Sequence, residues 1–534
     1  MKSCQALTPC RELFIISSSV IIRLLWDSRG GTHAVGFHAV GFALSENRFT
    51  MKLTRIFTHI QMLPVFLLVG GFLFVGCQAT RNLSQPTPRV PANSAMNNPT
   101  GAAGLGDSLY PTLGNGGYDT LHYTIALTVD MQSHAVTGTT TIAARATQAL
   151  SSFNFDFQGL QIQKIIVDAK PATFQRMASE LTIKPAASLR NGQPFTTTIA
   201  YSGVPTALTD PGVPFEKIGW LVYKPGIFVA SEPSGAMTWY PVNNHPRDKA
   251  TYTFRITVAK PYVVAANGLL QAELDQGDNR TFQWEMHKPM ASYLATLTIA
   301  KFKVVTEQGP NNLPIRNYFP LNASQQTLAP FQQTAEMIQF YSDLIGPFPF
   351  EAYGAVVVDD DFPTAFEAQT LSIFGPNTLF EAAVAHELSH QWFGDSVSLT
   401  NWQDIWLNEG FAMYLESLWL EHKQGQPAFA QRMHRLYQSM KEQQLGAAGS
   451  PTVETLFGPA TYVRGAWTLH ALRLRVGDAP FFKILRTYYS RYQYSNASTA
   501  DFIAIAETVS GQQLDDFFDA WLYTDAVPPE PTAP

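Results

Sequence analysis

The sequence predicts a multidomain α+β protein, with an N-terminal β-sheet sandwich-like domain followed by a mainly helical domain. From Leu121 to Val129 apolar residues alternate with smaller or polar ones, which is the pattern of a strand with one buried face. Thr- and Val-rich runs separated by Gly, Asn and Pro continue to about Ala300, and from Gln325 the apolar spacing becomes helical. The 534 residues also exceed what one hydrophobic core usually organises, so we expect two or more domains.

An export signal is expected at residues 51–76. Lys52 and Arg55 precede an apolar stretch at 62–76, which is shorter than the ~20 residues that span a membrane. Cys77 follows directly, and this ending resembles a bacterial lipoprotein signal, in which the cysteine is lipidated and becomes the new N-terminus. We therefore favour an exported, lipid-anchored protein of the cell envelope or surface. A plain signal, cleaved or uncleaved, is the alternative.

The segments on either side of the signal are expected to lie outside the folded domains. Because a signal normally starts a chain, we interpret residues 1–50 as a non-native upstream extension. A short membrane segment at 13–26 is the alternative, although Arg23 in its middle is unfavourable there. Residues 77–106 are rich in Ser, Pro, Asn, Thr and Gly, a composition typical of a flexible tether.

The remaining chain divides into two predicted domains and a tail. We place the β domain at residues 107–302, the helical domain at 303–526, and a Pro-rich tail without a visible packing role at 527–534. The helical spacing predicts several helices in the second domain. They are Ala383–Trp392, Glu409–His422, Pro427–Gln444, Thr461–Val476, Ala479–Tyr492 and Thr499–Val509.

Composition excludes some classes of protein. A hydrophobic content of 46% and a charged content of 15% are those of an ordinary globular protein, and a net charge of −6 without a basic block gives no reason to expect nucleic acid as a partner. The cysteines, Cys4, Cys10 and Cys77, all precede the predicted domains, so those domains can hold neither a disulfide nor a cysteine-based metal site. No obligate protein partner is evident.

The strongest chemical signal is His386-Glu387-Leu-Ser-His390, followed after residues 391–408 by Glu409. Two histidines four apart on a helix project from one face, where a single Zn²⁺ can accept both imidazoles. Glu409 can complete the ligand set and leave a fourth position open, as catalytic zinc sites do. Glu387 borders the metal without being needed as a ligand, and is therefore the natural base for a water molecule there.

An alternative interpretation is that these histidines are ordinary core residues. The segment from Leu371 to Gly394 is largely apolar, which predicts a buried helix, and buried histidines are usually only hydrogen-bonded. Two histidines and a glutamate buried on one turn would be costly without a charge partner, and a metal ion supplies it. The sequence therefore favours a zinc hydrolase, with one Zn²⁺ per chain.

Longer motifs resemble one family. His386–Asp395, followed by Trp402–Tyr414, is similar to the M1 family of zinc metallopeptidases, which includes the aminopeptidase N-like enzymes and leukotriene A4 hydrolase. Tyr341–Phe350 resembles the segment that opens its catalytic domain, and Tyr462–Trp467 resembles its Tyr-x-Lys-Gly-Ala motif. The resemblance covers about residues 106–525. It implies an N-terminal β domain and a thermolysin-like zinc peptidase domain.

The resemblance also implies roles for residues that spacing alone would not select. Tyr462 corresponds to the tyrosine that hydrogen-bonds the developing oxyanion, and Arg464 stands where the family has Lys. Glu367 aligns with the glutamate of the family's Gly-x-Met-Glu-Asn segment, which holds the substrate's α-ammonium. Ala365 and Phe366 belong to the same segment, whose backbone aligns the peptide, although Thr, Phe and Ala replace Gly, Met and Asn. Glu232 resembles a second acid, from the β domain, that assists Glu367.

These observations favour a zinc-dependent aminopeptidase that hydrolyses N-terminal residues from peptides. A zinc endopeptidase, or a hydrolase of a non-peptide bond like leukotriene A4 hydrolase, is the first alternative. An inactive surface-binding lipoprotein is the second, and the complete set of zinc ligands with Glu387 and Tyr462 argues against it.

Overall fold

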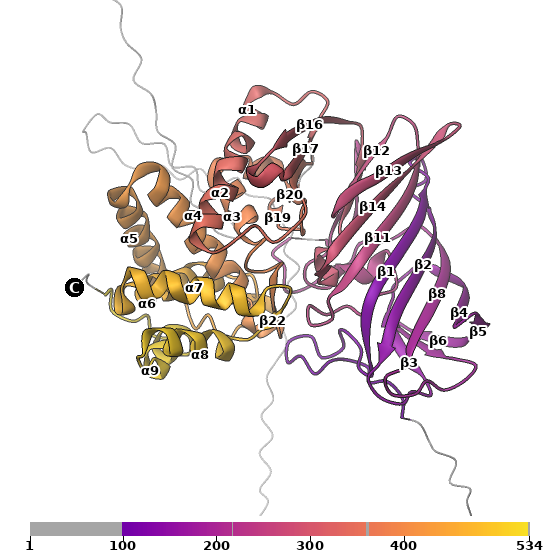
Figure 1. Cartoon of the computed structure of the whole chain (residues 1–534), viewed down its shortest axis with the longest axis horizontal. Helices are drawn as coiled ribbons and strands as arrows, with labels where there is room; N and C mark the ends of the chain where they lie inside the picture. Colours follow the sequence, from indigo (N-terminus) through magenta and orange to yellow (C-terminus); the bar gives the residue numbers. More distant parts are fainter. Residues whose placement is uncertain (1–98, 216, 359–361, 532–534) are drawn as a thin grey trace, which may run out of the picture. The chain divides into compact units, whose positions relative to one another are not determined.

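The computed structural model describes residues 99–531, except residues 216 and 359–361 (Figure 1). The predicted upstream extension, the signal and Cys77 lie outside the described residues. The end of the predicted tether lies within them and joins the β domain: the Gly101 N–H donates to the Ser152 carbonyl at 2.8 Å, and the Gly104 N–H donates to the Gly114 carbonyl at 2.9 Å. The β domain therefore includes residues before the predicted boundary at residue 107, because these backbone groups find partners in it.

An eight-stranded sheet forms one layer of the N-terminal domain, with strand order β13-β14-β11-β1-β2-β8-β4-β5. Adjacent strands are antiparallel except for β1 and β11, which run parallel. Buried and more exposed residues alternate along β1 and β2, which is the physical origin of the period of two in the sequence. The strands are β1 Tyr118–Val129, β2 Val136–Ala146, β4 Gln161–Val167, β5 Lys170–Pro171, β8 Pro194–Gly203, β11 Ala250–Ala259, β13 Leu269–Gln276 and β14 Asn279–Met290.

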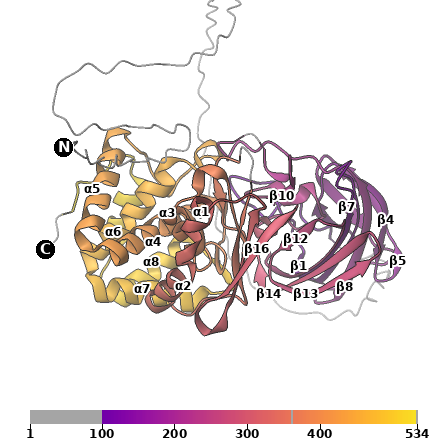
Figure 2. The same cartoon turned by 90° about the horizontal axis from the view of Figure 1, so that it is seen from above.

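Two smaller sheets complete this domain, in the orders β12-β15-β10-β9 and β3-β7-β6 (Figure 2). Every residue of β10 and β15 is buried, and one apolar core joins residues of all three sheets. The predicted β-rich, sandwich-like domain is confirmed. The strands are β3 Phe153–Asp156, β6 Thr173–Met177, β7 Glu180–Lys184, β9 Gly219–Tyr223, β10 Gly226–Ala230, β12 Val263–Ala266 and β15 Leu297–Ala300.

The second domain opens with a five-stranded sheet, ordered β16-β17-β18-β20-β19. The three inner strands are parallel, whereas the edge strands β16 and β19 are antiparallel to their neighbours. Strands β21 and β22 form a further, parallel pair that joins the segment after His390 to the segment before Thr499. The strands are β16 Phe302–Gln308, β17 Pro314–Pro320, β18 Tyr353–Val357, β19 Ala365–Phe366, β20 Ser372–Phe374, β21 Val397–Leu399 and β22 Ser495–Ala497.

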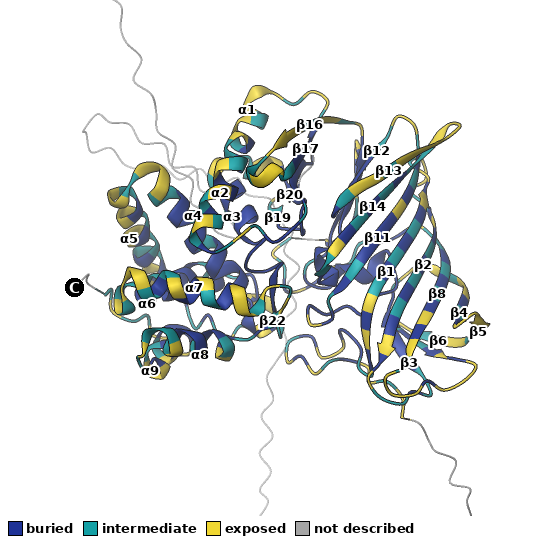
Figure 3. Cartoon of the chain, viewed as in Figure 1, coloured by how far each residue is buried: buried dark blue, intermediate teal, exposed yellow. Residues whose placement is uncertain are grey.

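Helices make up most of the second domain, and they turn their buried faces toward each other (Figure 3). None of the helices in the described part of the chain combines the length and the apolar character that a membrane span requires. Local signals set some ends: Ser498 and Asp501 form a capping box at the start of α8, and Gly511 ends it with a φ of 69°. The helices are α1 Gln325–Leu328, α2 Thr334–Leu344, α3 Glu381–Ser389, α4 Trp406–Gln424, α5 Gln426–Glu442, α6 Gly465–Val476, α7 Asp478–Tyr492, α8 Thr499–Ser510 and α9 Asp515–Phe518.

The described part of the Pro-rich tail packs against α5, so the prediction that it has no packing role is wrong. The Tyr437 hydroxyl donates to the Pro528 carbonyl at 2.7 Å, and His434 Nδ1 lies 3.1 Å from Glu530 Oε1. Val527 also contacts the core of the helical domain. Side chains of α5 hold this segment of the tail in place. The sequence does not reveal these contacts, because they join positions far apart in the chain.

Two glycines bring α4 and α6 into close contact. A Cβ added to Gly410 would lie 2.7 Å from the Gly465 Cα, and a Cβ added to Gly465 would lie 2.8 Å from the Gly410 Cα. Contacts that short do not occur, so the backbones approach this closely only because neither residue has a side chain. The pair places the start of α6 beside the turn of α4 that carries Glu409.

We predict that Gly410→Ala lowers the free energy of unfolding by roughly 1–3 kcal/mol, because the added methyl group overpacks a contact between two backbones. Gly446→Ala is the matched control, since its Cβ would meet only Asp525 Oδ1 at 3.4 Å, an ordinary contact. Chemical denaturation of the two variants and the parent measures the effect. Equal loss of stability in both variants would contradict the packing argument.

Candidate active site

Helix α3 and the first turn of α4 bring His386, His390 and Glu409 together. Glu409 Oε2 lies 3.4 Å from His386 Nε2 and 3.6 Å from His390 Nε2. One ligand atom from each residue lies within 4.8 Å of the others. Ligand atoms about 2.0–2.1 Å from a tetrahedral zinc ion are about 3.4 Å apart, so these separations and this donor set fit Zn²⁺.

The second nitrogen of each imidazole is already engaged. His386 Nδ1 lies 3.4 Å from Glu416 Oε2, and Glu416 Oε1 accepts from Arg432 Nη2 at 2.7 Å. His390 Nδ1 lies 3.2 Å from the Phe393 carbonyl oxygen. A proton on each Nδ1 leaves both Nε2 lone pairs free for the metal, which is how such outer partners orient histidine ligands.

Sequence reasoning missed Glu416 and Arg432. Glu416 follows Glu409 by two helical turns and lies on the same face of α4, a spacing that could have indicated it. Arg432 comes from α5 and carries no local signal, because only the packing of α5 on α4 brings it to Glu416.

Charge is concentrated around the ligands. Burial opposes ionisation of the Glu409 carboxyl, but His390 and His386 outweigh it and lower its pKa to about 2. Glu387 is only 8% exposed, and burial raises its pKa to about 8, although both histidines oppose the shift. A carboxyl group with that pKa can exchange a proton near neutral pH.

Glu232 and Glu367 lie on another side of Glu409. One carboxylate oxygen from each of the three residues lies within 4.8 Å of the others. Glu232 Oε1 and Glu367 Oε1 are buried and have no hydrogen-bond partner within the described chain. Burial raises the pKa of both groups; Glu367 raises that of Glu232 further, whereas His390 opposes the rise at Glu367. Carboxylates this close and this poorly paired form a site for a cation.

Two different domains contribute these acids. Glu232 follows β10 of the β domain and precedes a cis bond to Pro233. Glu367 follows β19, and Gln391 holds it beside the histidine helix: Gln391 Nε2 donates to the Glu367 carbonyl at 3.1 Å, and Gln391 Oε1 accepts from the Thr370 N–H at 2.8 Å. The acid pair therefore depends on how the domains pack.

Lys249 links the β domain to the loop that follows helix α3. Its half-buried ammonium group donates to the carbonyl of Asp395 at 2.8 Å and to that of Ser396 at 3.0 Å. Burial lowers the Lys249 pKa to about 7, against the influence of Asp395. Sequence reasoning missed this residue, since the contact joins positions far apart in the chain.

Tyr462 lies in a π-helical turn, Ala460–Arg464, at the start of α6. Its ring stacks on that of His386, with centroids 6.2 Å apart and an angle of 24° between the planes. Burial, and then Glu409 among the nearby acids, raise the Tyr462 pKa well above its ordinary value. The hydroxyl therefore keeps its proton and can donate a hydrogen bond.

Ala365 and Phe366 form the edge strand β19. They pair with Phe374 and Ile373 of β20, and β19 has no strand on its other side among the described residues. An extended peptide can add to such an edge by backbone hydrogen bonds. Helix α3 contacts this strand, so a peptide bound there would run past the histidines.

We predict that Glu416→Gln weakens zinc binding about 10- to 100-fold without abolishing it, because an outer partner of His386 is altered while all three ligands remain. Competition with a metal chelator measures the affinity. Glu421→Gln is the control, since Glu421 lies on the same helix and pairs with Arg473 instead. An unchanged affinity in the Glu416 variant would show that this carboxylate does not support the ligand.

Two family models match the chain. Residues 119–294 match the Peptidase M1 N-terminal domain, and residues 329–521 match the Peptidase family M1 domain. The matched regions correspond to the β domain, which supplies Glu232, and to the domain that carries His386, His390 and Glu409.

Similar proteins are peptidases of this type. A crystal structure of an M1 zinc metallopeptidase from Deinococcus radiodurans is similar with a TM-score of 0.76 and 30% identity, covering 81% of this chain and 100% of that one. A variant of that protein was solved with a Tyr-Ser-Ala substrate.

Among the curated relatives, glutamyl aminopeptidase of Sus scrofa is 27% identical over 320 residues, which are 54% of this chain and 34% of the relative. Leukotriene A-4 hydrolase of Xenopus laevis is 25% identical over 448 residues, covering 76% and 72%. The chain thus spans about a third of the length of the mammalian aminopeptidase that it matches.

Proposed function

Because the chain belongs to the M1 family of zinc metallopeptidases, we propose that it is an aminopeptidase that removes residues from the N-termini of peptides. The observation that carries the proposal is the pair of buried, unpartnered carboxylate oxygens of Glu232 and Glu367, close to Glu409. A free α-ammonium group is the cation that an aminopeptidase substrate brings, and it can donate to both acids at once.

The position of these acids relative to the metal site supports an exopeptidase. Their oxygens lie within 4.8 Å of a Glu409 oxygen, so an ammonium group held there places the first peptide bond beside the ligands. A longer stretch of peptide on the N-terminal side has no cation to offer the two carboxylates, and it would leave them buried and unpaired. The Tyr-Ser-Ala substrate bound to the Deinococcus radiodurans variant is consistent with short peptides as substrates.

The proposed mechanism distributes the chemistry among a few residues. His386, His390 and Glu409 would hold Zn²⁺, which when bound would polarise the scissile carbonyl and lower the pKa of a water molecule. Glu387, buried beside the two histidines, accepts the proton of the attacking water and later delivers it to the leaving amine. Tyr462 donates a hydrogen bond to the carbonyl oxygen as negative charge develops on it.

The edge strand and the acids orient the peptide for this reaction. The free edge of β19, formed by Ala365 and Phe366, would align the backbone of the bound peptide. Glu232 and Glu367 would fix its N-terminus. Together the strand edge and the acids would hold the scissile bond in a single register.

We predict that the protein hydrolyses an alanyl fluorogenic amide and leaves its N-acetylated form intact. Glu232→Gln should raise KM for the unblocked substrate about 10- to 100-fold with zinc retained, because one charged acceptor of the ammonium is lost. Glu285→Gln, an acid of β14 that is not part of the site, is the control. Equal hydrolysis of blocked and unblocked substrates would favour an endopeptidase and contradict the proposal.

We also propose that the enzyme is exported and anchored to the cell envelope through a lipid on Cys77. The basic, apolar and cysteine-terminated layout of residues 51–77 supports it. Cys77→Ser should move the protein from the membrane fraction to the soluble fraction of expressing bacteria. Membrane association that persists in the Cys77 variant would exclude a lipid on that residue as the anchor.

A further inference from the structure

The Arg464 side chain is fully buried and makes hydrogen bonds to backbone carbonyl groups alone. Nε donates to Trp521, at 2.7 Å, and Nη1 donates to Leu445 and to Asp525, each at 3.1 Å. Nη2 reaches three more carbonyl oxygens. They are those of Ala520 at 3.0 Å, Ala526 at 3.2 Å and Thr524. A guanidinium group thus fills a cage built mainly from residues 520–526, which we name the carbonyl loop.

The carbonyl loop is a helix end. It begins inside the π-helical turn Asp519–Tyr523 that continues α9, and carbonyl groups at such an end have no partner within the helix. A buried cation satisfies them and also complements the negative end of the helix dipole. These hydrogen bonds also offset the free-energy cost of burying the guanidinium group, because Nε, Nη1 and Nη2 all donate to carbonyl oxygens.

Arg464 shares a single turn with Tyr462. Both lie in the π-helical turn Ala460–Arg464, and the Arg464 carbonyl accepts from Thr468 Oγ1 at 2.9 Å. On the side of the metal site, Gly465 contacts Gly410, the residue after Glu409. The turn that carries the tyrosine is therefore held on one side by the glycine contact and on the other side by the carbonyl loop.

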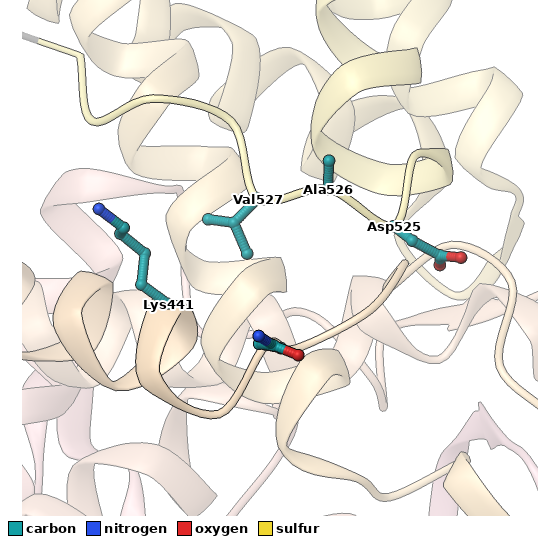
Figure 4. Close-up of a pocket in the computed structure, with 5 residues that line it drawn as sticks. Lys441, Asp525, Ala526 and Val527 are labelled. Atoms are coloured by element: carbon teal, nitrogen blue, oxygen red, sulfur yellow. The ribbon is translucent and has the colours of Figure 1, made fainter.

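Contacts with α5 and with Ala447 also hold the carbonyl loop and the residues that follow it in place. Beyond it the chain runs along α5, where Tyr437 and His434 contact Pro528 and Glu530. A pocket lined by Lys441, Gln444 and residues 525–527 lies where the loop passes α5 (Figure 4). The Asp525 carboxylate lies at this pocket and accepts from the Ala447 N–H at 3.4 Å.

We propose that Arg464 is a positioning residue for the reaction: it locks the carbonyl loop to the Tyr462 turn and thereby fixes the tyrosine hydroxyl over the reacting carbonyl. This inference rests on the proposed function, because Tyr462 is taken to act on substrate. A lysine at this position keeps the charge but has three donors from one atom, so it cannot reach acceptors spread over the whole cage. The loss would loosen the turn without touching a metal ligand.

The structural part of the inference is tested without any activity. Hydrogen exchange of peptides covering 456–466 and 519–527 should be about tenfold faster in Arg464→Lys than in the parent. Arg473→Lys is the matched control, since Arg473 lies on the same helix but pairs with Glu421 and Asp478. Equal exchange at 456–466 in the parent and in Arg464→Lys would overturn the inference.

The catalytic part is tested by a double-mutant cycle. Arg464→Lys should lower kcat about 10- to 100-fold with KM and zinc content nearly unchanged, as expected for a displaced oxyanion donor. In a Tyr462→Phe background the same change should have almost no further effect, because the hydroxyl that it positions is absent. Equal losses in both backgrounds would contradict the proposal.

A second variant covers the case in which Arg464→Lys does not fold. Asp525→Ala alters the exposed side of the carbonyl loop and leaves the guanidinium in place. It should lower kcat in the same Tyr462-dependent way, by about two- to fivefold, and an unchanged kcat would count against the proposal. A parent protein that cleaves no unblocked amide would refute the proposed function, whereas the exchange result would still decide the role of Arg464.

Discussion

Repulsion among buried acids is the constraint on which the rest of this structure depends. Glu232, Glu367, Glu387 and Glu409 surround two imidazoles inside the protein, and burial penalises their charged forms. Such a cluster is stable in its ionised form only with cations beside it. Zn²⁺ and the peptide ammonium group of the proposed function are two cations that would offset this repulsion.

The fold resists this repulsion with rigid supports from several directions. Glu416 orients one histidine, and Gln391 holds the segment of Glu367 beside the other. Lys249 joins the β domain, which supplies Glu232, to the loop after the histidine helix. Arg464 and the contact between Gly410 and Gly465 fix the turn that carries Tyr462. These contacts hold the elements that carry the acids close to one another.

Much of this could be predicted from local patterns. The period of two in β1 and the spacing of His386 and His390 are local features, and both describe the structure well. Helix α4 begins at Trp406, about one turn before the predicted start at Glu409, and Trp406 packs there against Phe411 and Phe502. Contacts between distant segments could not be predicted from the sequence. The hydrogen bonds around Arg464 and the packing of the tail against α5 join residues about 60–100 positions apart, and no local pattern in the sequence indicates them.

Anomalous X-ray scattering at the zinc absorption edge, recorded from crystals of the purified protein, tests the central claim most directly. The account predicts one strong peak per chain, within about 2.0–2.2 Å of His386 Nε2, His390 Nε2 and a Glu409 oxygen. A peak elsewhere, or none after crystals are soaked in zinc, would contradict it. So would a Glu409 side chain that turns away from both imidazoles.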